Sequence, residues 1–316
     1  MDNDLYVFSI KSEVTIIEIR SPLVSIIIPT YRRAEKLKNC LSSLIQSSYK
    51  NYEIIVIDDD PSTDLRELVY QYNAKYFHND RESYPAKSRN MGARLSRGDI
   101  LFFVDDDNVF EKDTILNLVN KFLELSNVGL FGPLMLNSQK ELWFCGARTN
   151  WMRPFLRVNS TRFSYNEIIE TDSIPNAYMI YRGLYFRVGG EDESLVFYNE
   201  EFDLAIRLKN AGYTNYIYTG SQIIHDYGTL FKHITPFRLY INMRGMLIVE
   251  RRYANHLKFI PFSVYFTGYI LFYILYRIPY SMRVSNRREY YLSVLRGVKD
   301  GIFSTSKLSP EYLIRG

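Results

Sequence analysis

Three consecutive aspartates, Asp105-Asp106-Asp107, are the residues of this chain best placed to do chemistry. They follow Ile100 to Val104, an apolar run without alternation, which predicts a buried strand. Carboxylates at the end of a buried strand are costly unless they face water or a cation. Because side chains at i and i+2 of an extended chain point the same way, we expect Asp105 and Asp107 to reach toward one divalent ion. The alternative is an ordinary solvated acidic turn.

A second apolar run also ends in carboxylates. Tyr52 to Ile57 precedes Asp58-Asp59-Asp60, and an earlier run, Leu23 to Pro29, ends at Thr30. These runs alternate with stretches of helical periodicity, which predicts βαβ units and a mostly parallel sheet. In open sheets of this kind, ligands bind beyond the carboxyl ends of the strands. We therefore expect the threonine and both acidic groups along one edge of the sheet, which favours a ligand site over a solvated turn.

Composition and cysteine usage describe a globular protein. The 316 residues are 47% hydrophobic and 23% charged, enough for one large domain with an extension. The two cysteines, Cys40 and Cys145, have no metal-binding spacing and suit a reducing compartment. The acidic start, Met1 to Asp4, lacks a signal-peptide pattern, so we expect a cytoplasmic protein.

Four stretches, taken together and in this order, resemble the family-two glycosyltransferases. They are Val24–Arg32, Glu53–Asp64, Arg89–Ala93 and Asp99–Asp107. The resemblance implies an inverting enzyme of the GT-A fold, a Rossmann-like α/β fold with a mostly parallel central sheet and flanking helices. We expect this domain at 23–235, after an extra N-terminal strand or hairpin at 1–22 and before a basic, aromatic helical region at 236–316.

The resemblance also implies ligands and site residues. The donor is expected to be a nucleoside-diphosphate sugar and the cofactor Mg²⁺ or Mn²⁺. The metal is assigned to Asp107, Asp105 and His225, although a purely structural role stays open for the histidine. Within the aspartate trio, Asp107 is the preferred metal ligand, Asp105 is assigned to the donor's ribose or to metal-bound water, and the identity of Asp106 is expected to matter least. Donor binding is assigned to Pro29, Thr30, Tyr31, Arg32, Asp58, Asp59, Arg89, Asp105 and Asp106.

The candidate base is Glu201. It lies in Asn199-Glu-Glu-Phe-Asp-Leu, which resembles the Glu-Asp-x-Asp-Leu of the family. An inverting transfer is a single displacement at the anomeric carbon, and a carboxylate must accept the proton of the attacking hydroxyl. Charge gathers on the leaving diphosphate, where a metal ion stabilises it. The alternative is an acid-rich first turn of a helix, with Asp203 and Arg207 as an ion pair at i and i+4.

The C-terminal region differs in charge from the rest of the chain. From residue 236 onward it carries 13 lysines and arginines against four acidic residues. Within it, 259–276 has no charge, and eight of its 18 residues are Phe or Tyr. A helix of that length is about 27 Å long, marginal for a bilayer. We favour in-plane attachment to an anionic membrane surface over a single span or a soluble packing helix. Nucleic acid is not expected, because the aromatic residues do not interleave with the charges.

These observations predict a metal-dependent inverting glycosyltransferase, peripheral on the cytoplasmic face of a membrane, with a glycan or lipid-linked acceptor. One alternative is a nucleotidyltransferase that makes the activated sugar, but the turn Pro29–Arg33 lacks the glycines of a phosphate loop. The other is a catalytically silent sugar-nucleotide binder. The presence of both the aspartate trio and Glu201 argues against silence.

Overall fold

The computed structural model describes residues 21–152, 156–158, 163–226, 235–254, 256–278 and 287–303. The predicted strand or hairpin at 1–22 therefore lies outside the described residues, except for its last two positions.

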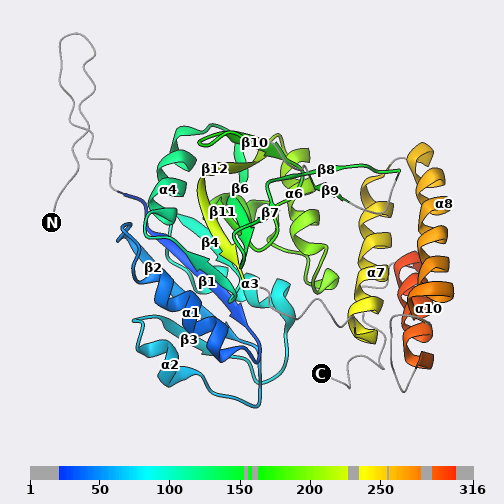
Figure 1. Cartoon of the computed structure of the whole chain (residues 1–316), viewed down its shortest axis with the longest axis horizontal. Helices are drawn as coiled ribbons and strands as arrows, with labels where there is room; N and C mark the ends of the chain where they lie inside the picture. The colour runs from blue at the N-terminus through cyan, green and yellow to red at the C-terminus, as the bar shows by residue number, and fades with distance from the viewer. Residues whose placement is uncertain are drawn as a thin grey trace, which may run out of the picture.

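A ten-stranded sheet forms the centre of the molecule, with helices on its flanks (Figure 1). In spatial order its main strands are β10 (Ile168–Thr171), β12 (Thr214–His225), β6 (Val128–Asn137), β11 (Ala177–Tyr181), β4 (Ile100–Val104), β1 (Val24–Thr30), β2 (Tyr52–Asp58) and β3 (Lys75–His78). Two short strands, β5 (Asn108–Phe110) and β7 (Leu142–Phe144), pair with β12 and β6. A separate two-stranded sheet contains β8 (Ala147–Thr149) and β9 (Leu156–Val158).

The sheet is mixed. Strands β3, β2, β1 and β4 are parallel, as predicted, and Thr30 lies opposite Asp58 at their common end. Strand β11, however, runs antiparallel to both of its neighbours, β4 and β6, and β10 runs antiparallel to β12. Strand β12 pairs parallel with β6, so six of the eight main strands run in one direction, and the prediction of a mostly parallel sheet needs correction only at β11 and β10. The apolar run of β11 is buried at four of five positions, and such a run contains no signal for strand direction.

The helices of the sheet domain are α1 (Ala34–Leu44), α2 (Arg66–Tyr70), α3 (Tyr84–Leu95), α4 (Thr114–Glu124), α5 (Arg182–Arg187), the short 3₁₀ helix η1 (Glu193–Leu195) and α6 (Glu200–Asn210). Helix α3 packs very closely on β1 at Gly92, where a Cβ atom would lie 2.3 Å from Cγ2 of Ile27. This close approach explains the glycine in the Arg89–Ala93 stretch. It also fixes the depth at which Arg89, one turn earlier, enters the protein.

Three helices follow the sheet domain. They are α7 (Pro236–Tyr253), α8 (His256–Phe272), which continues as the π-helical turn η3 (Tyr273–Arg277), and α10 (Arg287–Phe303). Over the described residues, these helices confirm the predicted helical, aromatic-rich character of the C-terminal region. Helix α7 lies nearest to the sheet domain, with α8 and α10 beyond it (Figure 1). Buried apolar side chains join the three helices: Leu239, Met243 and Leu247 of α7, Phe262 and Phe266 of α8, and Tyr290 and Val294 of α10. Over the described part of the chain, no helix is long and apolar enough to cross a membrane.

Candidate active site

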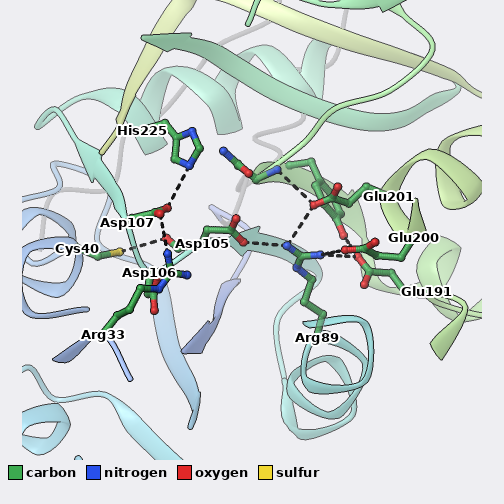
Figure 2. A network of polar contacts seen from close by, with 12 residues as sticks. Arg33, Cys40, Arg89, Asp105, Asp106, Asp107, Glu191, Glu200, Glu201 and His225 are labelled. Atoms are coloured by element: carbon green, nitrogen blue, oxygen red, sulfur yellow. Dashed lines mark hydrogen bonds and ion pairs between the residues drawn. The ribbon is translucent and has the colours of Figure 1, made fainter. Parts of the chain in front are cut away.

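The predicted edge of the sheet brings the polar strand ends together. Thr30 ends β1 beside Asp58, and Asp105 directly follows β4. From the other direction, Asn176 precedes β11, and its carbonyl accepts the N–H of Asp105 at 3.1 Å. His225 ends β12 at this same edge (Figure 2).

The three aspartates form a tight turn. The N–H of Asn108 donates to the carbonyl of Asp105 at 3.2 Å, which closes the turn. Asp105 then faces Arg89, at 2.8 Å, whereas Asp107 faces Arg33, at 2.8 Å (Figure 2). The expectation that Asp105 and Asp107 reach toward one point is therefore wrong, because the turn separates side chains that an extended chain would align.

Asp106 is the most buried of the trio. Its carboxylate accepts a hydrogen bond from the hydroxyl of Thr30 at 2.7 Å and lies 2.7 Å from Nη2 of Arg33. Burial raises the pKa of Asp106 to about 7, although the Arg33 charge and the Thr30 hydroxyl act in the opposite direction. This middle position is thus closely constrained by its surroundings. The expectation that it matters least can apply only to direct contact with a ligand.

Asp107 and His225 form the pair that best fits a divalent ion. Nε2 of His225 lies 3.3 Å from Oδ1 of Asp107, and both side chains are buried. Burial acts to raise the pKa of Asp107, but the hydrogen bond with His225 and the charge of Arg33 outweigh it and leave that pKa lowered. The ring of Trp143 meets the imidazole edge-on, with centroids 4.4 Å apart. An ionised carboxylate beside an imidazole is a donor set that Mg²⁺ and Mn²⁺ accept.

A second feature supports this fit. Asn108 lies opposite His225 in the β5–β12 pairing, and its carboxamide is buried. Neither carboxamide atom has a hydrogen-bond partner in the part of the chain that the structure describes. Among the described residues, no three His, Cys, Asp or Glu side chains come together around one point as a metal site. Two protein ligands are nevertheless enough where substrate phosphates and water complete the shell of Mg²⁺.

Arg89 is the centre of a buried charge cluster (Figure 2). Its guanidinium lies 2.8 Å from Asp105, 3.5 Å from Glu191, 3.1 Å from Glu200 and 3.1 Å from Glu201. One buried cation cannot balance four ionised carboxylates, so protonated forms are favoured within the cluster. Burial raises the pKa of Glu200 well above its ordinary value and raises the pKa of Glu191 as well.

Glu201 differs from the two other glutamates of this cluster in its accessibility. Its side chain is 13% exposed, against 3% for Glu200 and 0% for Glu191. Burial still raises the pKa of Glu201 to about 7, with the Arg89 charge acting in the opposite direction. A carboxylate that is reachable and titrates near neutral pH has the properties of a general base. The Asp203–Arg207 ion pair predicted on the same helix is present, at 2.7 Å.

The other residues assigned to the donor lie along β1 and β2. Pro29 is buried within β1. Asp58 accepts a hydrogen bond from the Tyr76 hydroxyl at 2.8 Å, and Asp59 accepts one from the side chain of Ser88 at 3.0 Å. Both aspartates are thus held in place by neighbours within the fold.

Tyr31 and Arg32 lie at the outer side of this edge. The guanidinium carbon of Arg32 lies 4.9 Å from the centre of the Tyr31 ring, and Arg32 reaches Asp60 at 3.4 Å. The structure thus places Arg32 away from the aspartate trio, where Arg33 takes the central position. Alternation after a strand end predicts only that two adjacent arginines point in different directions and does not say which of them faces the trio.

Two further contacts have no clear sequence signal. Lys36 of α1 forms an ion pair with Asp226, whose N–H donates to the carbonyl of Asp107 at 2.8 Å. The hydroxyl of Tyr178 on β11 hydrogen-bonds to Glu191 within the Arg89 cluster. Both contacts join segments that are far apart in the chain, so only the tertiary structure reveals them.

Comparison with known proteins identifies the family. Residues 25–183, half of the chain, match the model described as glycosyl transferase family 2. The chain belongs to this family. The matched stretch of the family 2 chain includes Thr30, Asp58, Arg89 and the aspartate trio, whereas Glu201 and His225 lie beyond it. An uncharacterized glycosyltransferase of Rickettsia conorii is 36% identical over 108 residues, which are 33% of this chain and 18% of that protein.

Solved structures show the fold of this family 2 member. The structure of GalNAc-T7 with UDP, GalNAc and Mn²⁺ has a TM-score of 0.62 at 17% identity, and the match covers 94% of this chain and 58% of that one. The mannosyltransferase PcManGT of Pyrobaculum calidifontis, in complex with GDP-Man and Mn²⁺, has a TM-score of 0.56 at 14% identity, and the match covers 91% and 89% of the two chains. The fold is therefore of the GT-A kind, with a mixed sheet and flanking helices.

Proposed function

We propose that this family 2 protein is a metal-dependent inverting glycosyltransferase that moves a sugar from a nucleoside-diphosphate sugar to an acceptor hydroxyl. The observation that carries the proposal is the position of Glu201. It lies at the same sheet edge as the aspartate trio and is the most exposed of the three glutamates around Arg89. Its pKa is raised to about 7. A site with these properties can accept a proton at neutral pH.

The proposed reaction is a single displacement. The acceptor oxygen attacks the anomeric carbon while Glu201 accepts its proton, and the bond between that carbon and the diphosphate oxygen breaks. The electron pair of the broken bond leaves with the nucleoside diphosphate, so the anomeric configuration is inverted. Arg89 holds the carboxylate of Glu201 at 3.1 Å, which restricts the directions from which the hydroxyl can approach.

Asp107 and His225 are the residues that would hold Mg²⁺ or Mn²⁺. A divalent ion bound there would supply positive charge opposite the leaving diphosphate. Arg33 adds a second positive charge at this place, because its guanidinium lies 2.8 Å from Asp107 and is partly exposed. Thr30, Asp58 and the segment after each are the proposed contacts of the nucleoside. The nucleotide complexes and Mn²⁺ of the structural neighbours support these assignments by analogy of fold.

We propose further that the acceptor is a glycan or a lipid-linked glycan, reached from the cytoplasmic face of an anionic membrane. The support is the outer surface of α8 and of its continuation η3, called here the exposed face of α8: Leu257, Ile260, Val264 and Leu271 of α8 and Leu275 of η3. Leu257 and Leu275 expose 82% and 67% of their surface. A helix that faces only water would carry polar residues there. The exposed basic residues of α10, among them Arg288 and Lys299, suit an anionic lipid surface.

Substitution of Glu201 by Gln tests the reaction. The amide keeps the size of the side chain but cannot accept the proton, so we expect transfer to fall by about 10²- to 10⁴-fold. Donor affinity should stay unchanged, because the donor diphosphate is assigned to other residues. The measurements are release of nucleoside diphosphate and isothermal titration with UDP-GlcNAc, UDP-GalNAc and GDP-mannose in Mn²⁺. Near-normal turnover of Glu201→Gln would contradict the assignment of the base. A wild-type protein that binds a donor without turning it over would instead indicate a silent binder.

A further inference from the structure

The segment 191–203 carries the proposed base and is anchored inside the protein by Arg89. Nη1 of Arg89 lies 3.5 Å from Glu191 and 3.1 Å from Glu200. This guanidinium therefore joins the start of the segment to the first turn of α6. The same guanidinium also contacts Asp105 and Glu201. Because four carboxylates share it, Arg89 does not fix the position of Glu201 by itself.

A second arginine makes a parallel bridge next to the first. Nη1 of Arg252, near the end of α7, lies 2.6 Å from Asp192 and 3.1 Å from Asp203. The hydroxyl of Tyr253 donates to the same carboxylate of Asp203 at 2.7 Å. Asp203 is buried and lies two residues after Glu201 on α6. The end of α7 thus holds the helix that presents the proposed base.

The chain between the bridged points is strained and rests on α7. Val196 has φ 71° and ψ −70°, and the N–H of Phe197 donates to the carbonyl of Leu195 at 2.9 Å, which defines a γ-turn. A β-branched residue adopts this conformation only where its surroundings enforce it. Val196 is buried in a cluster with Tyr240 and Ile241 of α7, which supplies that enforcement.

Two more contacts extend this support along the helix. Nη1 of Arg244 donates to the carbonyl of Ser194 at 2.5 Å. One residue later, Gly245 allows Asn199 to approach, since a Cβ atom there would lie 2.5 Å from its Nδ2. Helix α7 therefore contacts the segment 191–203 from its beginning to the residue that precedes α6.

We propose that α7 is a positioning element of the active site, in which Arg252 and Tyr253 align Glu201 through their shared contact with Asp203. This inference rests on the proposed role of Glu201 as the base. Both residues of α7 act through Asp203, so we assign them a positioning role and not a catalytic one. Loss of the outer bridge removes the α7 contacts to Asp203 from the first turn of α6. The contacts of Arg207 and the buried face of α6 still hold the rest of the helix, so we expect the carboxylate of the base to depart from the geometry that proton transfer needs while the fold remains intact.

The test compares the double variant R252M/Y253F with Arg251→Met. Arg251 is a matched control, because it is the preceding arginine of α7 but donates to the carbonyl of Gly301 on α10, at 3.2 Å. We expect R252M/Y253F to lower kcat for release of nucleoside diphosphate by about 10- to 100-fold. UDP-GlcNAc, UDP-GalNAc and GDP-mannose are first screened for binding. The Kd of the donor that binds should change by less than about twofold in R252M/Y253F. The single variant Arg252→Lys keeps the positive charge, so its kcat should lie much closer to that of the wild type than the kcat of R252M/Y253F does.

A structural readout makes the result independent of turnover. Amide hydrogen exchange in 192–203 should become faster in R252M/Y253F and stay unchanged in Arg251→Met. The fluorescence of Trp151 should shift only in the former, because its ring lies 5.9 Å from Phe202 and 6.4 Å from Tyr253.

Three results would overturn the inference: unchanged exchange in R252M/Y253F, an equal loss of kcat in Arg251→Met, or a donor Kd that weakens as much as kcat falls. If the wild-type protein turns over no donor, the proposed function fails. The exchange comparison still decides whether α7 positions the helix that carries Glu201.

Discussion

Nη2 of Arg89 lies 3.1 Å from the carboxylate of Glu201 and 2.8 Å from that of Asp105, so one buried guanidinium joins the proposed base to the acidic turn. The charge of Arg89 acts to lower the pKa of Glu201, but burial outweighs it and raises that pKa to about 7. The balance between burial and this single cation sets the pH range in which the site can work.

The first prediction concerns pH. A base acts in its unprotonated form, so the rate of transfer should rise with pH and level off above about pH 7, with a slope of about tenfold per pH unit well below that value. The measurement is kcat at saturating donor from pH 5 to 8.5. Donor Kd across the same range is the control that separates the base from donor binding. A rate that is independent of pH below 7 would contradict a base with this raised pKa.

Much of this edge could be predicted from the sequence. The apolar runs of β1, β2 and β4 are buried along nearly their whole length, and their ends had to meet once the strands were parallel. The direction of β11 could not be predicted, because a fully apolar strand fits a sheet in either orientation. The helical character of the C-terminal region was predictable, and the uncharged stretch 259–276 lies within α8 and η3. The contacts of α7 with α6 depend on tertiary packing alone.

The roles within the site were harder to predict than its location. Side chains at i and i+2 point the same way only in an extended chain. Residues Asp105–Asp107 form a turn, so the spacing does not predict where their carboxylates point. The choice between Arg32 and Arg33 depends on the backbone after β1, where Arg32 has φ 56°, a left-handed conformation. No composition or periodicity argument indicates such a reversal at an arginine.

The second prediction concerns the metal. Asp107→Ala and His225→Ala should each weaken Mn²⁺ binding by at least about tenfold, since even the partners of metal ligands are worth 10- to 100-fold. Asp105→Ala should have a smaller effect, because Asp105 faces Arg89 and not His225. Isothermal titration of Mn²⁺ in the presence of UDP provides the affinities. Equal losses in all three variants would mean that the aspartate turn rearranges around the ion, and no loss in any of them would remove the metal from this place.

The third prediction concerns stability. Asp106→Ala leaves the buried hydroxyl of Thr30 without its acceptor and takes one of two carboxylates away from Arg33. We expect the free energy of unfolding to fall by about 1–3 kcal/mol. Urea denaturation measures this change, and Asp80→Ala, at an exposed position, is the matched control. If Asp106→Ala is as stable as wild type while transfer is lost, the residue contacts the donor and its contribution to the fold is small.

The last prediction concerns the exposed face of α8. Replacement of both Leu271 and Leu275 by Glu puts negative charge on that face without changing the side chains that pack on α7. If the face lies on anionic lipid, the double variant should bind vesicles of phosphatidylglycerol at least about tenfold more weakly than wild type. The two glutamate carboxylates are unfavourable in the apolar part of the lipid interface, and the anionic headgroups repel them. Co-sedimentation with these vesicles and with phosphatidylcholine measures the effect. Leu123→Glu, an exposed leucine of α4, should bind as wild type does. If the wild-type protein binds neither kind of vesicle, the membrane proposal is wrong. If light scattering then shows a wild-type dimer that the double variant converts to a monomer, the exposed face of α8 is a contact between two copies of the chain.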